Sequence, residues 1–427
     1  MIRPPVALWP LLLALALCLL LPTSCEGEYF VTPYVTPSPS PSATESIVEG
    51  DESLLRSLID GPEPTAETVN QVLKSIARNG GLPLRSATGG WLFACNCGVG
   101  SWNLAGDFNN WIPQAMNNKG PLHWLEIEID APEEAGYKFT DGAADWIADP
   151  WARRYVYDDN GELSLVRADS AHLERIPCFG PEQGLAERFL RVWVPAGGAF
   201  DRILFAHDAQ NLFDPEAIWG GWRLQDSLPA DVLVAGLDNS ADRLEEYTHT
   251  QDDIGLGSIG GSGDAYADLV ELTVRPYIDE HYGPGDVYGL LGSSLGGLIS
   301  LHIALRHPGR YDFVASMSGT LGWGRIGLAN QTIIEQYQGA GHGATAIYLD
   351  SGGAATTCVD SNGDGIWNDN ADTADNYCEN QQMRDVLTSL GYQFEVDLWH
   401  WHEPGASHNE TAWGQRVFRP LQIFAGM

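Results

Sequence analysis

Basic residues are scarce in this 427-residue chain. It holds 23 Lys and Arg against 57 Asp and Glu, so its formal net charge is −34 at pH 7. Electrostatic repulsion would oppose binding to nucleic acid or to an anionic membrane surface, and neither is expected as a partner. A solvated acidic surface fits an exported protein that stays soluble. The length predicts two or three domains with ample core.

The N-terminal apolar run Val6–Leu21 is short for a membrane span. It follows Arg3 and leads into small residues before Cys25, an order that predicts an export signal over residues 1–25. We expect a lipid anchor at Cys25, as in bacterial lipoproteins, with simple secretion or an uncleaved anchor as the alternatives. The expected location is extracellular or in the cell envelope.

Cysteines are also few. The seven present show no paired C-x-x-C spacing of the kind that holds zinc. Export permits disulfides, and we expect Cys358 to pair with Cys378 across a surface loop. Cys95 or Cys97 is then expected to pair with Cys178.

Composition divides the N-terminal third of the chain. Residues 26–50 contain alternating Pro and Ser and predict an unfolded tether. Residues 51–84 carry helical apolar spacing, broken at Gly61, and predict two short helices. Residues 85–170 contain short alternating or aromatic runs separated by turns, a pattern that predicts a small β-sandwich.

The segment Leu104-Ala-Gly-Asp-Phe-Asn-Asn-Trp111 resembles the early-set immunoglobulin-like modules. Among these are the glycogen-binding module of AMP-activated kinase and the N-terminal domains of glycogen-branching enzymes. The resemblance implies that Trp111 and Trp146 form a platform on which a sugar stacks. The alternative is that Phe108 and Trp111 only pack the sandwich.

From residue 185 to 427 the pattern becomes α/β, with apolar strand-like runs alternating with helical ones. The alternation predicts a mostly parallel sheet covered on both faces, with ligands binding beyond the carboxyl ends of the strands. The expected strands are 189–194, 202–206, 231–235, 286–291, 313–317, 345–349 and 394–399, and the expected helices 265–280, 295–306, 379–390 and 410–424.

The turn Gly292-Ser-Ser-Leu-Gly296 matches the G-x-S-x-G nucleophile elbow. An apolar strand precedes it and an apolar helix follows, as the elbow requires. The motif predicts Ser294 as the nucleophile of an α/β-hydrolase and the N–H of Leu295 as one oxyanion donor. An ordinary Gly/Ser turn is the alternative.

A serine nucleophile needs a histidine base and an acid that orients it, in the chain order Ser, Asp or Glu, His. His408, in the loop after the last strand, is the expected base; His400 and His402 are the alternatives. For the acid the sequence leaves Asp375 and Asp350 open, with Asp360 as a further option. Asp350 ends a predicted strand, whereas Asp375 requires that residues 355–373 loop out as an insertion.

The second oxyanion donor is expected after the strand 202–206, at Ala209 or Gln210. His207 and Asp208 in the same stretch precede Ser294 and so break the expected chain order.

Several separated segments resemble the putative esterase family, which includes enterochelin esterases, esterase D and feruloyl esterase modules. The segments are Asp208–Phe213, Asp238-Asn239 with Arg243, Gly292–Gly297, and Ser407–Glu410 with Trp413 and Arg416. The resemblance implies that Ser294 and His408 are nucleophile and base, and that Gln210 and Leu295 supply the oxyanion donors. Members usually carry Asp-Gly-Gln, where this chain has Asp208-Ala-Gln210.

The stretch Asp360-Ser-Asn-Gly-Asp-Gly365 follows the start of a calcium loop, with oxygen ligands at alternating positions. It predicts a structural calcium ion at Asp360, Asn362 and Asp364. The terminal bidentate Glu is missing, so an acidic, disulfide-closed loop without metal is the alternative. No cofactor is expected to be needed for catalysis.

The pattern as a whole predicts an exported serine hydrolase that cleaves carboxylic esters through an acyl-enzyme. The expected substrate is a small-molecule ester such as a siderophore, or a glycan-linked ester. Acyl transfer by the same triad is one alternative, and a non-catalytic glycan-binding protein on a hydrolase scaffold is another.

Overall fold

The computed structural model describes residues 49–369, 371 and 373–427. The predicted export signal with Cys25 lies outside them, as does the tether up to residue 48. The tether's last two residues, Glu49 and Gly50, belong instead to the first helix. Within the described ranges, no helix combines the length and the apolar character needed to cross a bilayer.

Two helices open the described chain, where the apolar spacing predicts them. They are α1 (Glu49–Asp60) and α2 (Ala66–Asn79), and the Oγ1 of Thr65 caps α2 by accepting the N–H of Thr68. Both bury leucine and isoleucine side chains against one face of β2 (Trp91–Asn96). β2 is therefore covered on both faces, with Leu92 toward the helices and Phe93 toward a second core.

That second core lies between a four-stranded sheet and one end of a much larger sheet. One sheet has the order β1 (Leu84–Arg85), β2, β6 (Leu122–Ile127) and β5 (Asn117–Lys119). The facing strands are β3 (Asn103–Gly106), β4 (Gln114–Ala115), β7 (Gly136–Thr140) and β8 (Trp146–Ile147). Phe93, Leu125, Tyr137 and Phe139 pack between them. The relation of this sandwich to the early-set modules stays a prediction.

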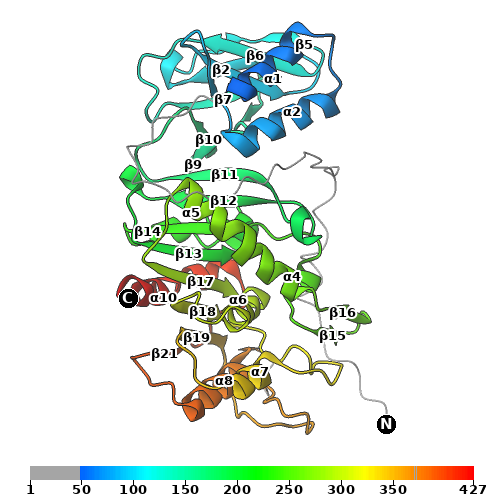
Figure 1. Cartoon of the computed structure of the whole chain (residues 1–427), viewed down its shortest axis with the longest axis vertical. Coiled ribbons are helices and arrows are strands. Elements are labelled where there is room, and N and C mark those ends of the chain that lie inside the picture. The colour runs from blue at the N-terminus through cyan, green and yellow to red at the C-terminus, as the bar shows by residue number, and fades with distance from the viewer. Residues whose placement is uncertain (1–48, 370, 372) are drawn as a thin grey trace, which may run out of the picture.

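One large sheet connects the sandwich with the α/β part, and its strands are stacked along the long axis of the molecule in Figure 1. From the far edge its order is β20 (Ala374–Asp375), β19 (Ala346–Gly353), β18 (Phe313–Met317), β17 (Val287–Ser293), β13 (Arg202–His207), β14 (Val232–Leu237), β12 (Arg188–Val194), β11 (His172–Phe179), β9 (Arg154–Asp158), β10 (Gly161–Leu165), β7, β3 and β4. β21 (Leu398–His402) pairs with β19. A separate hairpin is formed by β15 (Gln251–Asp253) and β16 (Ser258–Gly260).

The sheet is mixed rather than mostly parallel. The strands from β14 through β13, β17, β18 and β19 to β21 run parallel, whereas β12 and β11 run antiparallel to their neighbours. The parallel part has the α/β-hydrolase-like arrangement that the sequence predicts, with the antiparallel strands continuing toward the sandwich.

Helices cover both faces of the parallel part. Along β17, Leu290 belongs to one core and Leu291 to the other, as the twofold alternation of a strand requires. The first core is closed by α4 (Gly263–Asp268), the π-helical stretch η8 (Leu269–Val274), α5 (Arg275–His281), α6 (Leu295–Arg306), α7 (Ile333–Ala340) and α8 (Tyr377–Leu390). The second is closed by α9 (Glu410–Gly414) and α10 (Phe418–Ala425).

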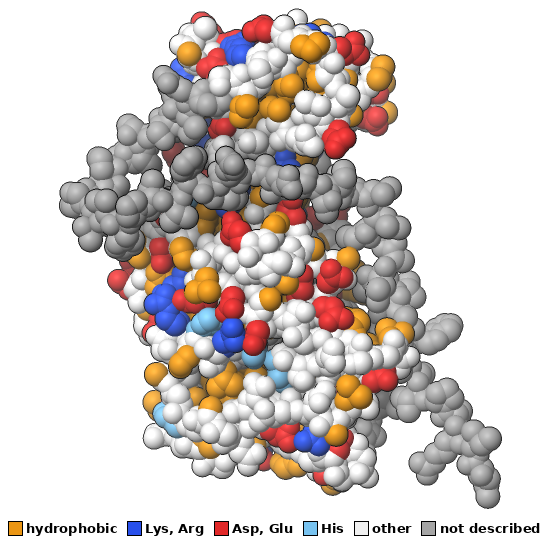
Figure 2. Space-filling model, turned by 45° about the vertical axis from the view of Figure 1, so that its right-hand side comes forward, with side chains coloured by type: hydrophobic (Ala, Val, Ile, Leu, Met, Phe, Trp, Pro, Cys, Tyr) orange, Lys and Arg blue, Asp and Glu red, His pale blue; other side chains and the backbone are white. Residues whose placement is uncertain are grey.

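Acidic side chains are spread over both halves of the molecule on the face shown in Figure 2, and basic ones form only small groups. This distribution matches the net charge of −34.

Two strand ends differ from the predicted ones in a way that matters for the site. β19 continues four residues beyond the predicted end at Leu349, because β20 and β21 both pair with its last residues. β21 begins at Leu398 and ends at His402, so His400 and His402 lie within the strand instead of after it.

Candidate active site

Ser294 forms a strained corner between β17 and α6. Its φ is 56° and its ψ is −123°, a conformation that non-glycine residues rarely adopt. A Cβ on Gly292 would lie 2.3 Å from the carbonyl oxygen of Gly296, and one on Gly297 would lie 2.5 Å from Ser316 Oγ. Only glycine fits at both positions, so the corner has the geometry of a nucleophile elbow.

The residues after β18 hold the corner in place. The N–H of Ser294 donates to the carbonyl oxygen of Met317 (2.9 Å), and the N–H of Thr320 donates to the carbonyl oxygen of Ser294 (3.2 Å). The Oγ of Ser294 lies 3.4 Å from the Oγ1 of Thr320. The serine hydroxyl thus meets the segment that follows β18.

His408 lies in the loop after β21, two residues before α9. Its Nδ1 is hydrogen-bonded to the Oδ1 of Asp375, and its ring packs edge-on against Trp413 at a centroid distance of 4.8 Å. The side chain is 41% exposed. With Nδ1 engaged by a carboxylate, Nε2 is the nitrogen left to exchange a proton with a substrate or a nucleophile.

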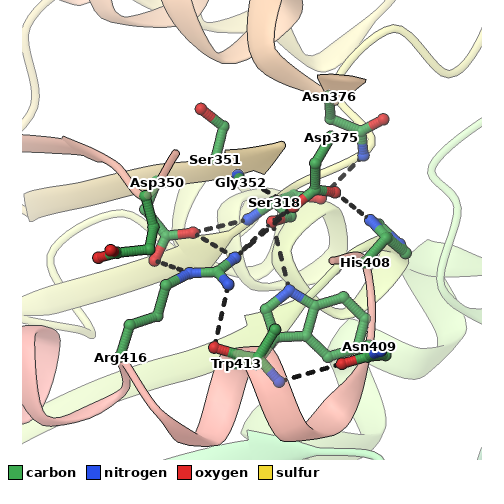
Figure 3. A network of polar contacts seen from close by, with 12 residues as sticks. Ser318, Asp350, Ser351, Gly352, Asp375, Asn376, His408, Asn409, Trp413 and Arg416 are labelled. Carbon is green, nitrogen blue, oxygen red and sulfur yellow. Dashed lines mark hydrogen bonds and ion pairs between the residues drawn. The ribbon is translucent and has the colours of Figure 1, made fainter. Parts of the chain in front are cut away.

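Asp375 is buried, and its hydrogen bonds favour its ionised form. The hydroxyl of Ser318 donates to its Oδ2 (2.6 Å), the N–H of Gly352 donates to the same oxygen (2.9 Å), and Arg416 lies 3.7 Å away. Burial alone would raise the pKa of Asp375, but its contacts with His408, Ser318 and Arg416 hold that pKa below its usual value. Figure 3 shows Asp375 between Ser318 and His408.

Asp350 faces a different partner. It is fully buried in β19, where Arg416 donates to both of its oxygens (3.1 and 3.2 Å) and Tyr348 donates to one (3.1 Å). Arg416 also donates to the Oγ of Ser318 (2.6 Å), which in turn donates to Asp375. Asp350 therefore supports Asp375 indirectly, through Arg416 and Ser318. The structure brings Asp375, and not Asp350, to His408. Asp360, the further option for the acid, is exposed and does not contact His408 in the described part of the chain.

Ser294 and the Asp375–His408 pair meet the same short segment of chain. Asn376 donates to the carbonyl oxygen of Ser318 (2.8 Å) and to Thr320 Oγ1 (3.3 Å), and Thr320 contacts Ser294. All of them lie at the carboxyl ends of neighbouring parallel strands. Ser294 and His408 are not joined by a direct hydrogen bond in the described part of the chain; such bonds often tighten only in the substrate complex.

Both predicted oxyanion donors lie where the elbow meets the loop after β13. Leu295 is the first residue of α6, so its N–H has no acceptor within the helix. Gln210 lies in the short 3₁₀ turn η5 (Ala209–Asn211). A Cβ on Gly296 would lie 3.3 Å from the Oδ2 of Asp208, which shows how closely the two segments approach.

Side-chain clamps fix the loop that carries Gln210. Arg243 donates to both oxygens of Asp208 (2.7 and 2.8 Å), and Asp208 itself has a positive φ of 58°. The side chain of Gln210 is paired with Asn239, whose N–H donates to its Oε1 (3.1 Å). The sequence predicted no individual role for Arg243 or Asn239. Both lie in segments that resemble the putative esterase family.

Three other histidines named in the sequence analysis pack against neighbouring side chains or are buried, as expected for a structural role. His207 is buried with its Nδ1 2.9 Å from the hydroxyl of Tyr266, and burial lowers its pKa to about 4. Burial also lowers the pKa of His400 to about 4. His402 packs edge-on against Tyr377 at 4.7 Å. Within the described residues, His408 is the histidine paired with Asp375.

A disulfide and hydrogen bonds connect the insertion before Asp375 to α8. Cys358 and Cys378 are bridged, as predicted, with Cα atoms 5.2 Å apart. Asp369 accepts the N–H groups of Tyr377 (3.2 Å) and Cys378 (2.8 Å) and so caps the start of α8. The insertion therefore holds the helix that follows Asp375.

The other predicted disulfide is wrong. Cys95 is bridged to Cys97, so neither of them pairs with Cys178. Cys95 is near the end of β2 and Cys97 follows it two residues later, with Cα atoms 5.3 Å apart, within the range of a disulfide.

The calcium loop is folded around Asp360. Its carboxylate accepts the N–H groups of Gly363 (2.6 Å), Asp364 (3.1 Å) and Gly365 (2.9 Å), and Asn362 donates to Asp364 (2.6 Å). No group of three or more His, Cys, Asp or Glu side chains gathers to hold a metal ion in the described ranges. Calcium at Asp360, Asn362 and Asp364 stays a prediction.

Glu379, in the first turn of α8, gives the site a pH-dependent stability. Burial raises its pKa to about 8, and the nearby carboxylates of Asp369 and Asp375 add to the rise. The usual value is 4.5, so the folded chain binds one proton more than the unfolded chain between about pH 5 and pH 8. The free energy of unfolding is therefore expected to fall as pH rises through this range, by at most about 1.4 kcal/mol per pH unit.

Replacement of this carboxyl tests the expectation. Chemical unfolding of the wild type and of Glu379→Gln at pH 5, 6.5 and 8 should show that the variant gains stability relative to the wild type as pH rises. Glu182→Gln, at an exposed position, is the matched control and should follow the wild type. Parallel stability curves for all three proteins would contradict the assignment.

One family model matches the part of the chain that contains most of this site. Residues 238–422 match the model of the family described as putative esterase. This range contains Ser294, Asp375 and His408 and begins after Gln210. No curated protein matches the chain in sequence.

Solved structures with a similar fold include three hydrolases. The enterobactin esterase FES from Shigella flexneri shares 14% identity at a TM-score of 0.42, over 79% of this chain and 93% of that one. An IroE-like serine hydrolase from Shewanella oneidensis shares 14% at 0.45, over 60% and 80%. The siderophore hydrolase EstA from Aspergillus nidulans shares 16% at 0.42, over 60% and 94%.

Proposed function

Because residues 238–422 match the model of the putative esterase family, we propose that this protein is a serine hydrolase that cleaves carboxylic esters through an acyl-enzyme. The observation that carries the proposal is the Asp375–His408 pair beside the strained corner at Ser294. An ordinary Gly/Ser turn would have no reason to lie next to a buried, ionised carboxylate that orients an exposed imidazole.

In the proposed mechanism, the Oγ of Ser294 attacks the ester carbonyl while the Nε2 of His408 takes its proton. The N–H groups of Gln210 and Leu295 stabilise the negative oxygen that forms. His408 then protonates the departing alcohol, which leaves an acyl group on Ser294. Water, activated by the same imidazole, releases the acid and restores the serine.

The role of Asp375 is to hold His408 in the tautomer with Nε2 free and to stabilise the imidazolium that forms. Ser318 and the N–H of Gly352 fix the carboxylate, and Arg416 keeps it ionised. This support comes from β18, β19 and α9–α10, so the acid is held from three directions.

The substrate is proposed to be a small-molecule or glycan-linked ester. The net charge of −34 disfavours a strongly anionic substrate such as a ferric siderophore trilactone, although the family includes siderophore esterases. Transfer of the acyl group to an alcohol other than water is compatible with the same residues.

Hydrolysis of p-nitrophenyl butyrate by the purified protein tests the proposal. The expected result is steady release of p-nitrophenolate that a fluorophosphonate inhibitor abolishes. Absence of turnover with acetate, butyrate and octanoate esters alike would contradict the hydrolase assignment and favour a non-catalytic binding protein.

Export and a lipid anchor at Cys25 are proposed on separate grounds. The bridged pairs Cys95–Cys97 and Cys358–Cys378 are compatible with an oxidising compartment outside the cytosol. The anchor itself rests on the sequence of residues 1–25.

A second activity, glycan binding, is favoured by the aromatic pair of the sandwich. The rings of Trp111 and Trp146 lie 6.2 Å apart, and Trp146 is 42% exposed. Trp111 has a positive φ of 59°, and its Nε1 donates to Asp107 (2.9 Å), which fixes the ring. Two neighbouring indoles at a surface, one of them held by a hydrogen bond, can stack a sugar ring.

Binding of maltoheptaose, measured by calorimetry, tests this activity. Trp146→Ala is expected to weaken binding about tenfold, because one stacking face is lost. Trp401→Ala removes another exposed indole, on β21, and should bind as the wild type does. Equal affinity of all three proteins, or no binding by the wild type, would leave the pair as packing only.

A further inference from the structure

Trp219 is unusually exposed for its size and is held in an unfavourable backbone conformation. Its relative exposure is 63%, and its φ is 56° although it is not a glycine. The preceding residue, Ile218, is 43% exposed. Exposure of two large apolar side chains and a left-handed backbone both cost stability, and such strained positions concentrate at functional sites.

The loop that carries Trp219 is fastened to both halves of the catalytic site. The Oγ1 of Thr411, in the helix that begins just after His408, donates to the carbonyl oxygen of Trp219. At the other end of the loop, the N–H of Trp222 donates to the carbonyl oxygen of Asn211, next to Gln210. The loop of Trp219 is therefore bonded both to α9, which begins two residues after His408, and to the segment that carries Gln210.

Contacts within the chain fix the loop in this position. Gly221 has a φ of 62°, and a Cβ there would lie 2.2 Å from the carbonyl oxygen of Asp214. The side chain of Asn211 donates to Glu410 (3.3 Å), which joins the oxyanion loop to α9 directly. Because the loop is fixed at both ends and at its glycine, the indole is presented in advance of binding.

We propose that Trp219 is a specificity residue that stacks on an uncharged ring carried by the ester substrate. The inference rests on the proposed esterase function and narrows its substrate class. An exposed indole face offers a ring about as much contact as any side chain can, at little entropic cost. The same loop carries Asp214 and Glu216, and Glu410 lies beside it, so an anionic ring would be repelled.

Four esters test the proposal on the intact enzyme. Ethyl acetate has no ring, ethyl benzoate has one on the acyl side, benzyl acetate has one on the alcohol side, and monoethyl terephthalate adds a carboxylate to the acyl ring. The wild type is expected to prefer one of the two neutral ring esters over ethyl acetate, and to hydrolyse monoethyl terephthalate more slowly than ethyl benzoate.

The substitution Trp219→Ala is expected to lower kcat/KM for the preferred ring ester about tenfold relative to kcat/KM for ethyl acetate. Trp219→Phe keeps a ring face and should retain that ratio within about threefold. Trp401→Ala is the matched control and should leave the ratio unchanged. The thermal midpoint of each variant shows whether it folds, and Trp219→Leu replaces the alanine variant if that one does not.

The outcomes separate the two claims. Hydrolysis of ethyl acetate with an unchanged ratio in Trp219→Ala would overturn the stacking role and leave the esterase function standing. An equal loss of kcat/KM on all esters in Trp219→Ala would also overturn the stacking role, since a purely structural role of Trp219 predicts such a loss. Absence of turnover of every ester by the wild type would overturn both.

Discussion

Replacement of Ser294 by alanine is expected to lower kcat for ester hydrolysis by at least about 10⁴-fold. Loss of the nucleophile alone removes nearly all of the rate that a serine triad supplies, and only binding and oxyanion stabilisation remain. The measurement is the rate of p-nitrophenyl butyrate hydrolysis at saturating substrate, together with the thermal midpoint.

The neighbouring serine provides a matched control. Ser293 is the last residue of β17 and is buried, so Ser293→Ala removes the same hydroxyl one position away from the corner. It should retain most of the activity. The fold should survive in Ser294→Ala, because its backbone hydrogen bonds to Met317 and Thr320 do not involve the hydroxyl. Full activity in Ser294→Ala would remove the basis of the mechanism.

The second large effect distinguishes the two candidate acids. Asp375→Asn is expected to lower kcat about 10⁴-fold, because an amide favours the wrong tautomer of His408. Its stability should change little, since the amide oxygen still accepts from Ser318 and Gly352. The rate loss should appear at neutral pH, where the depressed pKa of Asp375 keeps this carboxyl ionised in the wild type.

Asp350→Asn should show the opposite pattern. It leaves the buried guanidinium of Arg416 without its main counter-charge, a change that costs about 3–5 kcal/mol of stability. The molecules that remain folded should keep kcat within about tenfold of the wild type. Measured together, kcat and the free energy of unfolding assign the acid: a kcat loss confined to Asp350→Asn would exchange the two roles.

The proposed nucleophile and base could be singled out in the sequence because both depend on local pattern and chain order. The elbow is a short motif with glycines that the geometry demands, and His408 follows the last strand just ahead of a helix. Helix α6 begins and ends at the predicted residues, since its apolar run directly follows the corner.

The proposed acid could not be singled out in the sequence, because its contact with His408 depends on pairing between distant segments. The four residues after Leu349, Asp-Ser-Gly-Gly, have the composition of a turn. The predicted strand therefore ended just before Asp350. In the structure β19 runs on to Gly353, and Gly352 pairs with Asp375 after an insertion of some twenty residues. Only this pairing returns Asp375 to the strand end.

Residues that hold the proposed acid in place were harder to predict from the sequence. Ser318 was missed, although it follows β18 and precedes Gly319 in a stretch of small residues. Its φ of 46° turns the chain so that its hydroxyl reaches Asp375, which no local pattern shows. Strand β11 was also missed; Pro177 within it is atypical of a strand, and a register shift between Ile176 and Phe179 accommodates it.

Labelling with a fluorophosphonate probe, followed by mass spectrometry of the peptides, tests the central claim most directly. The native protein should carry one phosphonyl group, on the peptide that contains Ser294, and His408→Ala should lose most of the labelling rate. A native, folded protein that takes up no label, or is labelled at another residue, would contradict the account.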